Sequence, residues 1–184
     1  MPRSGADARR RLREAALDLY REHGYDATTT AQIAERAGVT ERTYFRHFAD
    51  KREVLFDGED DLRTVLVDAV AAAPPELPPL AVLTRAFTAA VPLFVAGRTV
   101  AERRQEIIVA TPALQERAHA KSAALTEALA TALAARGLPR PSALLAGRIG
   151  MASFGHALGS WDGRSASELE RLIAESAAEA RSLG

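Results

Sequence analysis

The sequence predicts an all-α protein of about nine helices, on three observations. Alanine, leucine and arginine are abundant while aromatic residues make up only 5% of the chain, a composition that favours helix. Glycine and proline divide the 184 residues into segments of helical length. Side chains that cap helices recur within residues 29–53 at the spacing of helix starts. No segment has the alternating apolar pattern of a strand, and no internal repeat is present.

The first expected helix covers residues 7–23. Leu12, Ala15 and Leu19 recur at helical spacing and give this segment one apolar face. Gly24 supplies a stop signal, because glycine readily adopts the left-handed conformation in which many helices end.

Two short helices joined by a tight turn are expected next. Thr29 can accept hydrogen bonds from free backbone amides, and Gln32 three residues later completes a capping box. Gly38 is a typical helix end, and Thr40 caps the following helix. Asp50 begins another capping box for the helix after that. Three start signals and one stop signal in this short span indicate a helix-turn-helix.

Proline and glycine set the bounds of the remaining helices. The PPELPP stretch at residues 74–79 is a stiff connector that a helix cannot cross, whereas Pro112 occupies a first-turn position where proline is tolerated. The expected helices are residues 51–72, 80–96, 99–110, 112–136, 141–160 and 165–183. We expect two domains, a helix-turn-helix domain at residues 1–52 and a helical domain at residues 53–184.

Composition narrows the class of protein. The chain has no cysteine, which excludes disulfides and thiolate–metal sites and suits a reducing cytoplasm. No apolar run is expected to span a membrane, and the start lacks the pattern of a signal peptide. The four histidines are scattered, so we expect no metal site. We also expect no other cofactor and no membrane partner.

Charge is distributed unevenly although the formal net charge is zero. Residues 1–52 carry 11 basic against 8 acidic side chains, and the rest of the chain carries the opposite imbalance. Arginines cluster at residues 9–13, and Arg42, Arg46, Lys51 and Arg52 cluster around the second short helix. Such a dipole steers one end of a protein toward DNA, although the arginine run also fits a solvated helix face.

The second short helix is expected to present a polar outer face. Tyr44 and Phe48 lie one turn apart and face the core together with Val39. This leaves Glu41, Arg42, Phe45 and Arg46 outside. A helix of this size fits the major groove of DNA, where an arginine can donate two hydrogen bonds to a guanine edge.

The candidate DNA contacts fall into two groups. Threonine methyls and an aromatic ring can meet a thymine methyl, whereas residues near helix starts are suited to phosphate contacts that fix the register. Helix capping alone also explains the presence of Thr29 and Thr40. The candidate base contacts are Thr40, Arg42, Thr43 and Phe45, the candidate phosphate contacts are Thr29, His47 and Lys51, and the outward-facing Glu41 and Arg46 are further candidate DNA contacts.

This N-terminal third resembles the TetR family of one-component transcriptional repressors. The agreement ends near Asp60, beyond which only the helical architecture is similar, and Phe45 stands where the family often has tyrosine. The residues that agree in type and spacing are Gly24-Tyr25, Thr29, Ile33-Ala34, Ala37-Gly38-Val39-Thr40, Thr43, Phe45 to Phe48 and Lys51.

The resemblance implies a homodimer that binds a palindromic DNA operator. One recognition helix contacts too few bases for useful specificity, and in this family the last two helices form a four-helix interface with a second copy. Four glycines in the penultimate helix indicate a close approach between helices, either to that partner or within the chain. The candidate interface residues are Gly147, Met151, Phe154, Gly155, Leu158, Leu169, Leu172 and Ile173.

The resemblance also implies a small-molecule effector held by the middle helices. Their apolar and aromatic residues can line a cavity for a small, apolar ligand or fill a solid core, and the sequence leaves both alternatives open. The candidate effector residues are Phe87, Val91, Phe94, Arg104, Ile107, Ile108 and His119.

Two alternative functions are an enzyme and a constitutive DNA-binding protein. An enzyme lacks support, because Ser153 and His156 lie on one helix without the strained turn of a serine hydrolase and no glycine-rich phosphate loop is present. A constitutive DNA-binding protein without an effector fits the same helix-turn-helix. The sequence therefore predicts a cytoplasmic, homodimeric, ligand-responsive repressor whose partners are double-stranded DNA, a second copy of itself and an unidentified effector.

Overall fold

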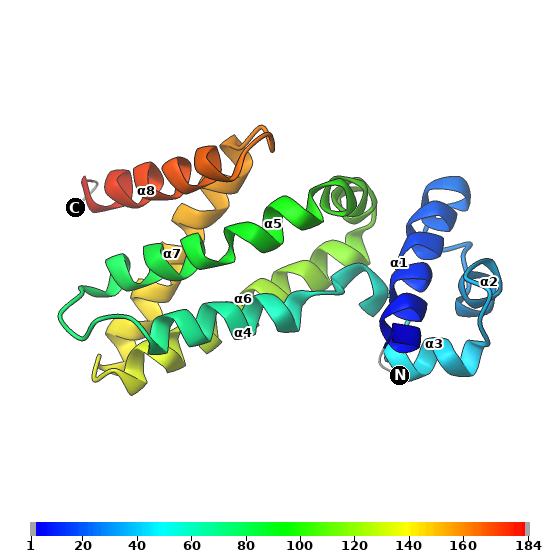
Figure 1. The fold of residues 1–184 in the computed structure, drawn as a ribbon, viewed down its shortest axis with the longest axis horizontal. Coiled ribbons are helices and arrows are strands. Elements are labelled where there is room, and N and C mark those ends of the chain that lie inside the picture. Colours follow the sequence, from blue (N-terminus) through cyan, green and yellow to red (C-terminus); the bar gives the residue numbers. More distant parts are fainter. Residues whose placement is uncertain (1–2, 183–184) are drawn as a thin grey trace. The chain divides into compact units, whose positions relative to one another are not determined.

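The computed structural model describes residues 3–182, and the elements within that range are all helical (Figure 1). This confirms the predicted all-α class. The helices are α1 (Arg3–His23), α2 (Thr30–Arg36), α3 (Glu41–His47), a 3₁₀ helix η1 (Glu53–Phe56), α4 (Glu59–Ala71), α5 (Pro79–Ala110), α6 (Pro112–Ala135), α7 (Arg140–Ser160) and α8 (Ala166–Ser182).

Two predicted helix bounds were wrong. The expected stop at Gly97 does not occur, and α5 runs through it as one helix of 32 residues. The expected helix at residues 51–72 is instead divided into η1 and α4, because Gly58 adopts a left-handed backbone with φ of +93°. A glycine inside a helix costs about 1 kcal/mol, which the packing of its neighbours can offset, but a positive φ ends the helix.

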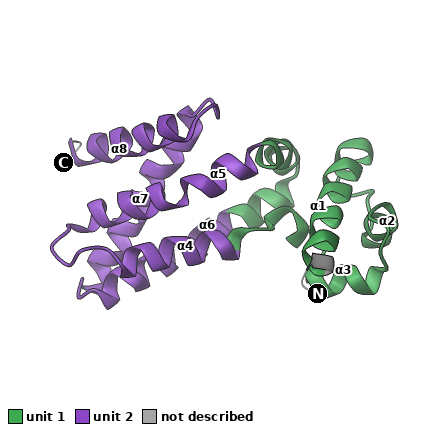
Figure 2. Cartoon of the chain, in the orientation of Figure 1, with its two compact units in different colours: residues 1–59, 99–118 green, residues 60–98, 119–184 purple. Residues whose placement is uncertain are grey.

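The chain forms two compact units (Figure 2). Unit 1 consists of residues 1–59 and 99–118, and unit 2 consists of residues 60–98 and 119–184. Helices α5 and α6 therefore contribute residues to both units. The domain boundary predicted at residues 52/53 remains a prediction, since it rests on the helix-turn-helix alone and not on this clustering.

The core of unit 1 joins the N-terminal helices to the end of α5 and the start of α6. Leu12, Ile33 and Tyr44 are fully buried there, and Ile107 and Leu114 pack into the same cluster. Arg103 and Arg117, named here as the anchoring arginines, add ion pairs. Arg103 Nη1 lies 3.0 Å from Glu14 Oε2 and its Nη2 lies 2.5 Å from Asp18 Oδ1, while Arg117 Nη2 lies 2.6 Å from Glu53 Oε1.

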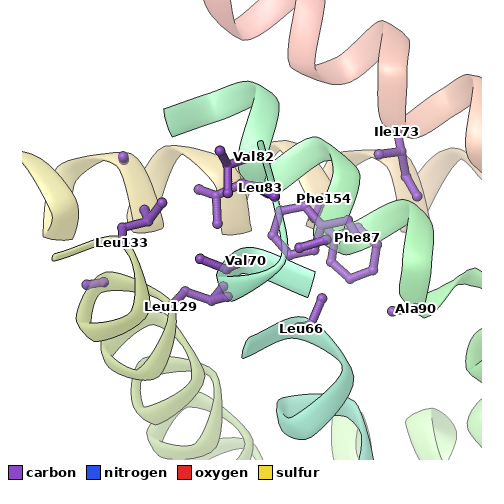
Figure 3. Close-up of a cluster of buried hydrophobic side chains, with 14 of the residues drawn as sticks. Leu66, Val70, Val82, Leu83, Phe87, Ala90, Leu129, Leu133, Phe154 and Ile173 are labelled. Carbon is purple, nitrogen blue, oxygen red and sulfur yellow. The ribbon is translucent and has the colours of Figure 1, made fainter. Parts of the chain in front are cut away.

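The core of unit 2 is organised around three phenylalanines. The rings of Phe87 and Phe154 stack with centroids 4.4 Å apart, and Phe94 meets Phe154 edge-on at 5.2 Å. Figure 3 shows the stacked pair among leucines and valines from α4, α5 and α6. Helix α7 comes close to α5 at Gly150, where a β-carbon would lie 2.6 Å from Leu83 Cδ1. Glycine at this position therefore permits the packing that brings Phe154 onto Phe87.

Helix α5 is long and apolar enough to cross a membrane when only length and composition are considered. Its most apolar 18-residue window has a mean hydropathy of 1.7. The helix end expected at Gly97 would instead divide this segment into two shorter helices. In unit 2 the apolar side of α5 is used for packing, with Val82, Leu83 and Phe87 almost fully buried. These residues belong to the core of unit 2, and 33% of the apolar window is buried in the structure.

Candidate nucleic-acid interface

The turn between α2 and α3 is built as the capping signals predicted. The Gln32 backbone N–H donates to Thr29 Oγ1 at 3.2 Å, and the Thr29 backbone N–H donates to Gln32 Oε1 at 2.8 Å. Gly38 has a φ of +65° and lets the chain turn directly into α3. Thr40 caps α3 by accepting a hydrogen bond from the Thr43 backbone N–H at 3.2 Å. The capping box at Thr29 and the cap at Thr40 are therefore confirmed, whereas the N-cap residue of η1 is Arg52, which makes no side-chain cap, and Asp50 accepts from the Glu53 N–H at 3.2 Å from outside the helix.

The inner face of α3 is fixed to the core of unit 1 by two aromatic rings. Tyr44 is fully buried and Phe48 is 4% exposed, as predicted, and their ring centroids lie 5.6 Å apart. The Tyr44 hydroxyl donates to the Asp50 carbonyl oxygen at 3.1 Å. Burial raises the pKa of Tyr44 far above its usual range, so this hydroxyl remains a donor. The rotation of α3 about its own axis is thereby set.

The outer face of α3 is exposed, and it carries the side chains predicted to contact bases. The Phe45 side chain is 51% exposed although it is a large apolar residue. Thr40, Glu41, Arg42 and Arg46 are also exposed, and Thr43 is half-buried. Exposed aromatic and cationic side chains on one short helix give a surface that can meet both bases and phosphates.

One contact on this face has no counterpart in the sequence analysis. Thr30 Oγ1 donates to Glu41 Oε1 at 2.5 Å and so links the first residue of α2 to the first residue of α3. The two residues are eleven positions apart, and neither of them is a cap. A capping pattern could not have revealed this contact, because it depends on the angle at which the two helices cross.

Lys51 has an internal role that the sequence analysis did not anticipate. Its ammonium donates to the Tyr25 carbonyl oxygen at 2.8 Å and to the Thr28 carbonyl oxygen at 3.0 Å. It also lies 4.1 Å from the centroid of the Tyr25 ring. Lys51 therefore holds the turn that precedes α2, and its predicted phosphate contact remains a prediction.

Replacing Lys51 with methionine should destabilise unit 1 by about 1.5–3 kcal/mol, the usual loss for hydrogen bonds to a charged donor. All three tyrosines, Tyr20, Tyr25 and Tyr44, lie in unit 1, so denaturation followed by the tyrosine band in near-ultraviolet circular dichroism measures this loss. Arg52→Met is the control, because Arg52 pairs with Asp50 on the exposed surface. Equal stability of the two variants would contradict the internal role of Lys51.

His47 lies at the end of α3 and is half-buried. Its Nε2 atom is buried, and no hydrogen-bond partner for it is found among the described residues. Burial lowers the pKa of His47, and the nearby charges of Arg46 and Arg9 lower it further. The imidazole is therefore neutral near pH 7 and adds no cation to this surface.

The arginines at the start of α1 are largely engaged within the protein. Arg9 and Arg13 both pair with Asp57, whose side chain is only 8% exposed. Arg11 donates to the Ala37 carbonyl oxygen at 2.8 Å, and Arg10 pairs with Asp7. These contacts give the arginine run a role in the fold of unit 1, which neither of the two alternatives from the sequence included.

The candidate effector residues are divided between the two cores. Phe87, Val91 and Phe94 belong to the core of unit 2, whereas Ile107 and Ile108 belong to the core of unit 1. These residues do not share one buried cluster, because α5 continues past Gly97 and its C-terminal residues belong to the other unit, and the single effector lining remains a prediction. Arg104 is half-buried in unit 1, where burial lowers its pKa, and His119 is exposed.

A pocket in unit 2 is close to the predicted effector region. It lies between α5, α7 and α8, has a volume of about 10 Å³ and is lined by Leu83, Phe87, Phe154 and Ile173 among others. This volume holds about one water molecule. In unit 2 this region is therefore packed, whereas Ile107 of unit 1 lines a separate pocket of about 540 Å³, and the choice between cavity and core for the effector remains a prediction.

Several candidate interface residues are buried within the chain. Gly147, Phe154, Leu169 and Ile173 are buried, and Met151, Leu158 and Leu172 are half-buried. A β-carbon at Gly147 would lie 3.2 Å from the Thr126 carbonyl oxygen, so this close approach is to α6 of the same chain. Gly155, in contrast, is exposed with no atom close to where a β-carbon would lie.

Family comparisons match most of the chain in two segments. Residues 12–57 match a model described as "Bacterial regulatory proteins, tetR family". Residues 77–182 match a model described as "MftR C-terminal domain". The first segment contains α2, α3 and most of α1, and the second contains α5 to α8.

Two curated proteins are similar over the N-terminal part. The HTH-type transcriptional regulator TcmR of Streptomyces glaucescens is 38% identical over 81 residues, which are 44% of this chain and 36% of that protein. YvkB of Bacillus subtilis (strain 168), an uncharacterized HTH-type transcriptional regulator, is 49% identical over 43 residues, which are 23% of each chain. The matches thus span about a third and a quarter of these relatives' own lengths.

Solved structures show the same fold over nearly the whole chain. A TetR-family regulator from Mesorhizobium loti MAFF303099 has a TM-score of 0.60 at 21% identity, covering 97% of both chains. The TetR-family repressor FadR of Thermus thermophilus, solved with lauroyl-CoA, has a TM-score of 0.55 at 22% identity, covering 94% of this chain and 93% of that one. At these identities the similarity is one of fold.

Proposed function

Because the chain belongs to the TetR family of bacterial regulatory proteins, we propose that it is a repressor that binds a palindromic operator as a homodimer. As a member of this family it is a DNA-binding transcription regulator and not an enzyme. We propose that it acts in the cytoplasm and that a small, apolar effector releases it from DNA.

One observation carries the DNA-binding part of the proposal. Buried Tyr44 and Phe48 anchor α3, while its outer face exposes Arg42, Phe45 and Arg46. A recognition helix in a helix-turn-helix enters the major groove with its N-terminal residues against the base edges. Anchored backbone and exposed contact side chains are the two properties that such a helix needs.

Dimerisation is proposed to use the exposed face of α7. Leu145 is 59% exposed, and Ala152, Gly155, His156 and Gly159 follow it at helical spacing on the same exposed side. A groove between α7 and α8, lined by Ile149, Ser153 and Ser176 among others, lies beside this face. Apart from the exposed Arg148 and His156, this strip consists of small and apolar residues, which permit the close helix approach of a two-fold interface.

Placing arginine at Gly155 should prevent dimerisation, because a long cation cannot fit where two helices approach closely. The matched control is Ala120→Arg, which adds the same side chain to an exposed position of α6. Sedimentation equilibrium should show a monomer for Gly155→Arg and a dimer for Ala120→Arg and the parent protein. A dimer in all three would place the interface elsewhere.

Effector release is proposed to require opening of the core between α5, α7 and α8. The pocket there is apolar but has room for only about one water molecule, so a ligand must displace α8 or the stacked phenylalanines. Helix α5 carries this pocket in unit 2 and the anchoring arginine Arg103 in unit 1. A ligand that prefers the opened core would thereby shift the population away from the DNA-competent state.

The effector proposal is tested by release from DNA. Cells that express the protein would be extracted with an apolar solvent, and the extract would be separated into fractions. Each fraction would be added to the protein bound to a selected operator duplex, and the fluorescence anisotropy of the duplex would be measured. A saturable release by one fraction is expected. Full release requires the effector to bind the state that does not bind DNA more tightly by about 5.5 kcal/mol, which converts a 1:99 ratio of the two states to 99:1. Unchanged anisotropy with every fraction would favour the constitutive DNA-binding protein.

A further inference from the structure

The contact between Thr30 and Glu41 fixes an acidic side chain at the start of the recognition helix. Thr30 Oγ1 donates to Glu41 Oε1 at 2.5 Å. We propose that Glu41 selects cytosine at one position of each operator half-site and that Thr30 is its positioning residue. This inference rests on the proposed function, because it names the base that the DNA-binding surface prefers.

The contact is not required to cap either helix. Thr29 caps α2 by accepting from the Gln32 N–H, and Thr40 caps α3 by accepting from the Thr43 N–H, so neither cap uses the Thr30 hydroxyl or the Glu41 carboxylate. The Thr30 hydroxyl is therefore available to hold Glu41, and one carboxylate oxygen, Oε1, is committed to it. Among the described side chains, Oε2 of Glu41 has no hydrogen-bond or ion-pair partner, and the residue is exposed. One acceptor oxygen is thus held in place and the other remains available to accept a hydrogen bond.

A carboxylate at this position discriminates between hydrogen-bond donors and acceptors on DNA. It can only accept hydrogen bonds, so it is repelled by phosphates and by the acceptor edges of guanine and thymine. Major-groove donors are the exocyclic amines of cytosine and adenine. In adenine the amine stands beside the N7 acceptor, which repels the second carboxylate oxygen. Cytosine has no acceptor there, so it is the base that a glutamate matches best.

Thr30 makes this selection more effective by ordering the side chain in advance. A free glutamate loses rotamer entropy when it is fixed. Since Thr30 already restricts Glu41, less of that loss falls on DNA binding. A second role of the contact, joining α2 to α3, would affect the stability of unit 1 but would not choose a base. Base preference and stability therefore separate the two roles.

The test compares sequences selected from a random DNA pool by the parent protein, Glu41→Gln and the control Glu35→Gln. Glu35 is an exposed glutamate of α2, so its replacement removes the same charge from a neighbouring helix. The parent and Glu35→Gln should both enrich cytosine at one half-site position. Glu41→Gln should lose this preference by roughly 5- to 150-fold in competition binding and shift toward adenine, which glutamine matches with two hydrogen bonds.

Thr30 variants test the positioning role. Thr30→Val keeps the shape but removes the hydroxyl, so it should weaken the cytosine preference at that position alone, and Thr30→Ser should restore it. If the parent enriches a palindrome that Glu41→Gln leaves unchanged, this inference fails while the proposed function stands. If the parent enriches no sequence, the proposed function itself fails. If Thr30→Val lowers stability without changing base preference, Thr30 only joins the two helices.

Discussion

Arg42→Ala should lower the preference for one base pair of the operator by roughly 5- to 150-fold. Arg42 is exposed on α3, beside the capped start of the helix, and no ion pair holds it among the described residues. An arginine in this situation can donate two hydrogen bonds to the O6 and N7 atoms of guanine, an interaction that contributes about 1–3 kcal/mol of discrimination. Fluorescence anisotropy with operators altered one base pair at a time would locate the loss.

The control for this experiment is Arg63→Ala. Arg63 is exposed on α4 in unit 2, so its replacement removes the same charge away from the helix-turn-helix segment. Its base preferences should equal those of the parent protein. A uniform weakening across all operators in Arg42→Ala, with a salt slope lower by about one, would instead identify a phosphate contact.

Phe154→Ala should destabilise unit 2 by about 3–5 kcal/mol. The ring is 4% exposed, stacks on Phe87 at 4.4 Å and receives the edge of Phe94 at 5.2 Å. Truncation removes these contacts and leaves a cavity in a core with little room to collapse. The single tryptophan, Trp161, lies in unit 2, so urea denaturation followed by tryptophan fluorescence measures this unit.

Phe45→Ala is the matched control for stability. Its ring is 51% exposed on α3 in unit 1, so the same truncation should change the stability of unit 1, followed by the tyrosine band in near-ultraviolet circular dichroism, by no more than about 0.5 kcal/mol. A loss below about 1 kcal/mol in Phe154→Ala would contradict the packed core, and would indicate that unit 2 opens where the effector is proposed to enter.

Local patterns in the sequence were sufficient for the helix-turn-helix. The capping box at Thr29, the turn at Gly38 and the cap at Thr40 depend on residues three or four positions apart, and all three are confirmed. The inward position of Tyr44 and Phe48 follows from the helical period, and it is also confirmed. These features need no knowledge of distant parts of the chain.

Features that depend on distant contacts were not predictable. The role of Lys51 requires the positions of two carbonyl oxygens some 25 residues earlier, in the turn before α2. The surroundings of the α7 glycines also depend on distant contacts. Gly150 packs against Leu83 of α5, whereas no atom lies close to where a β-carbon of Gly155 would be. A sequence pattern shows that glycines allow close approach, but only the packing shows which helix approaches which glycine.

Selection of bound sequences from a random DNA pool tests the central claim most directly. The purified parent protein should enrich a two-fold symmetric consensus whose half-sites lie about one helical turn apart, roughly 34 Å, or a multiple of it. This result would establish a dimer that binds DNA through α3 of each copy. Enrichment of an unsymmetric motif, or of no sequence at moderate salt, would contradict the account of this chain as a dimeric operator-binding repressor.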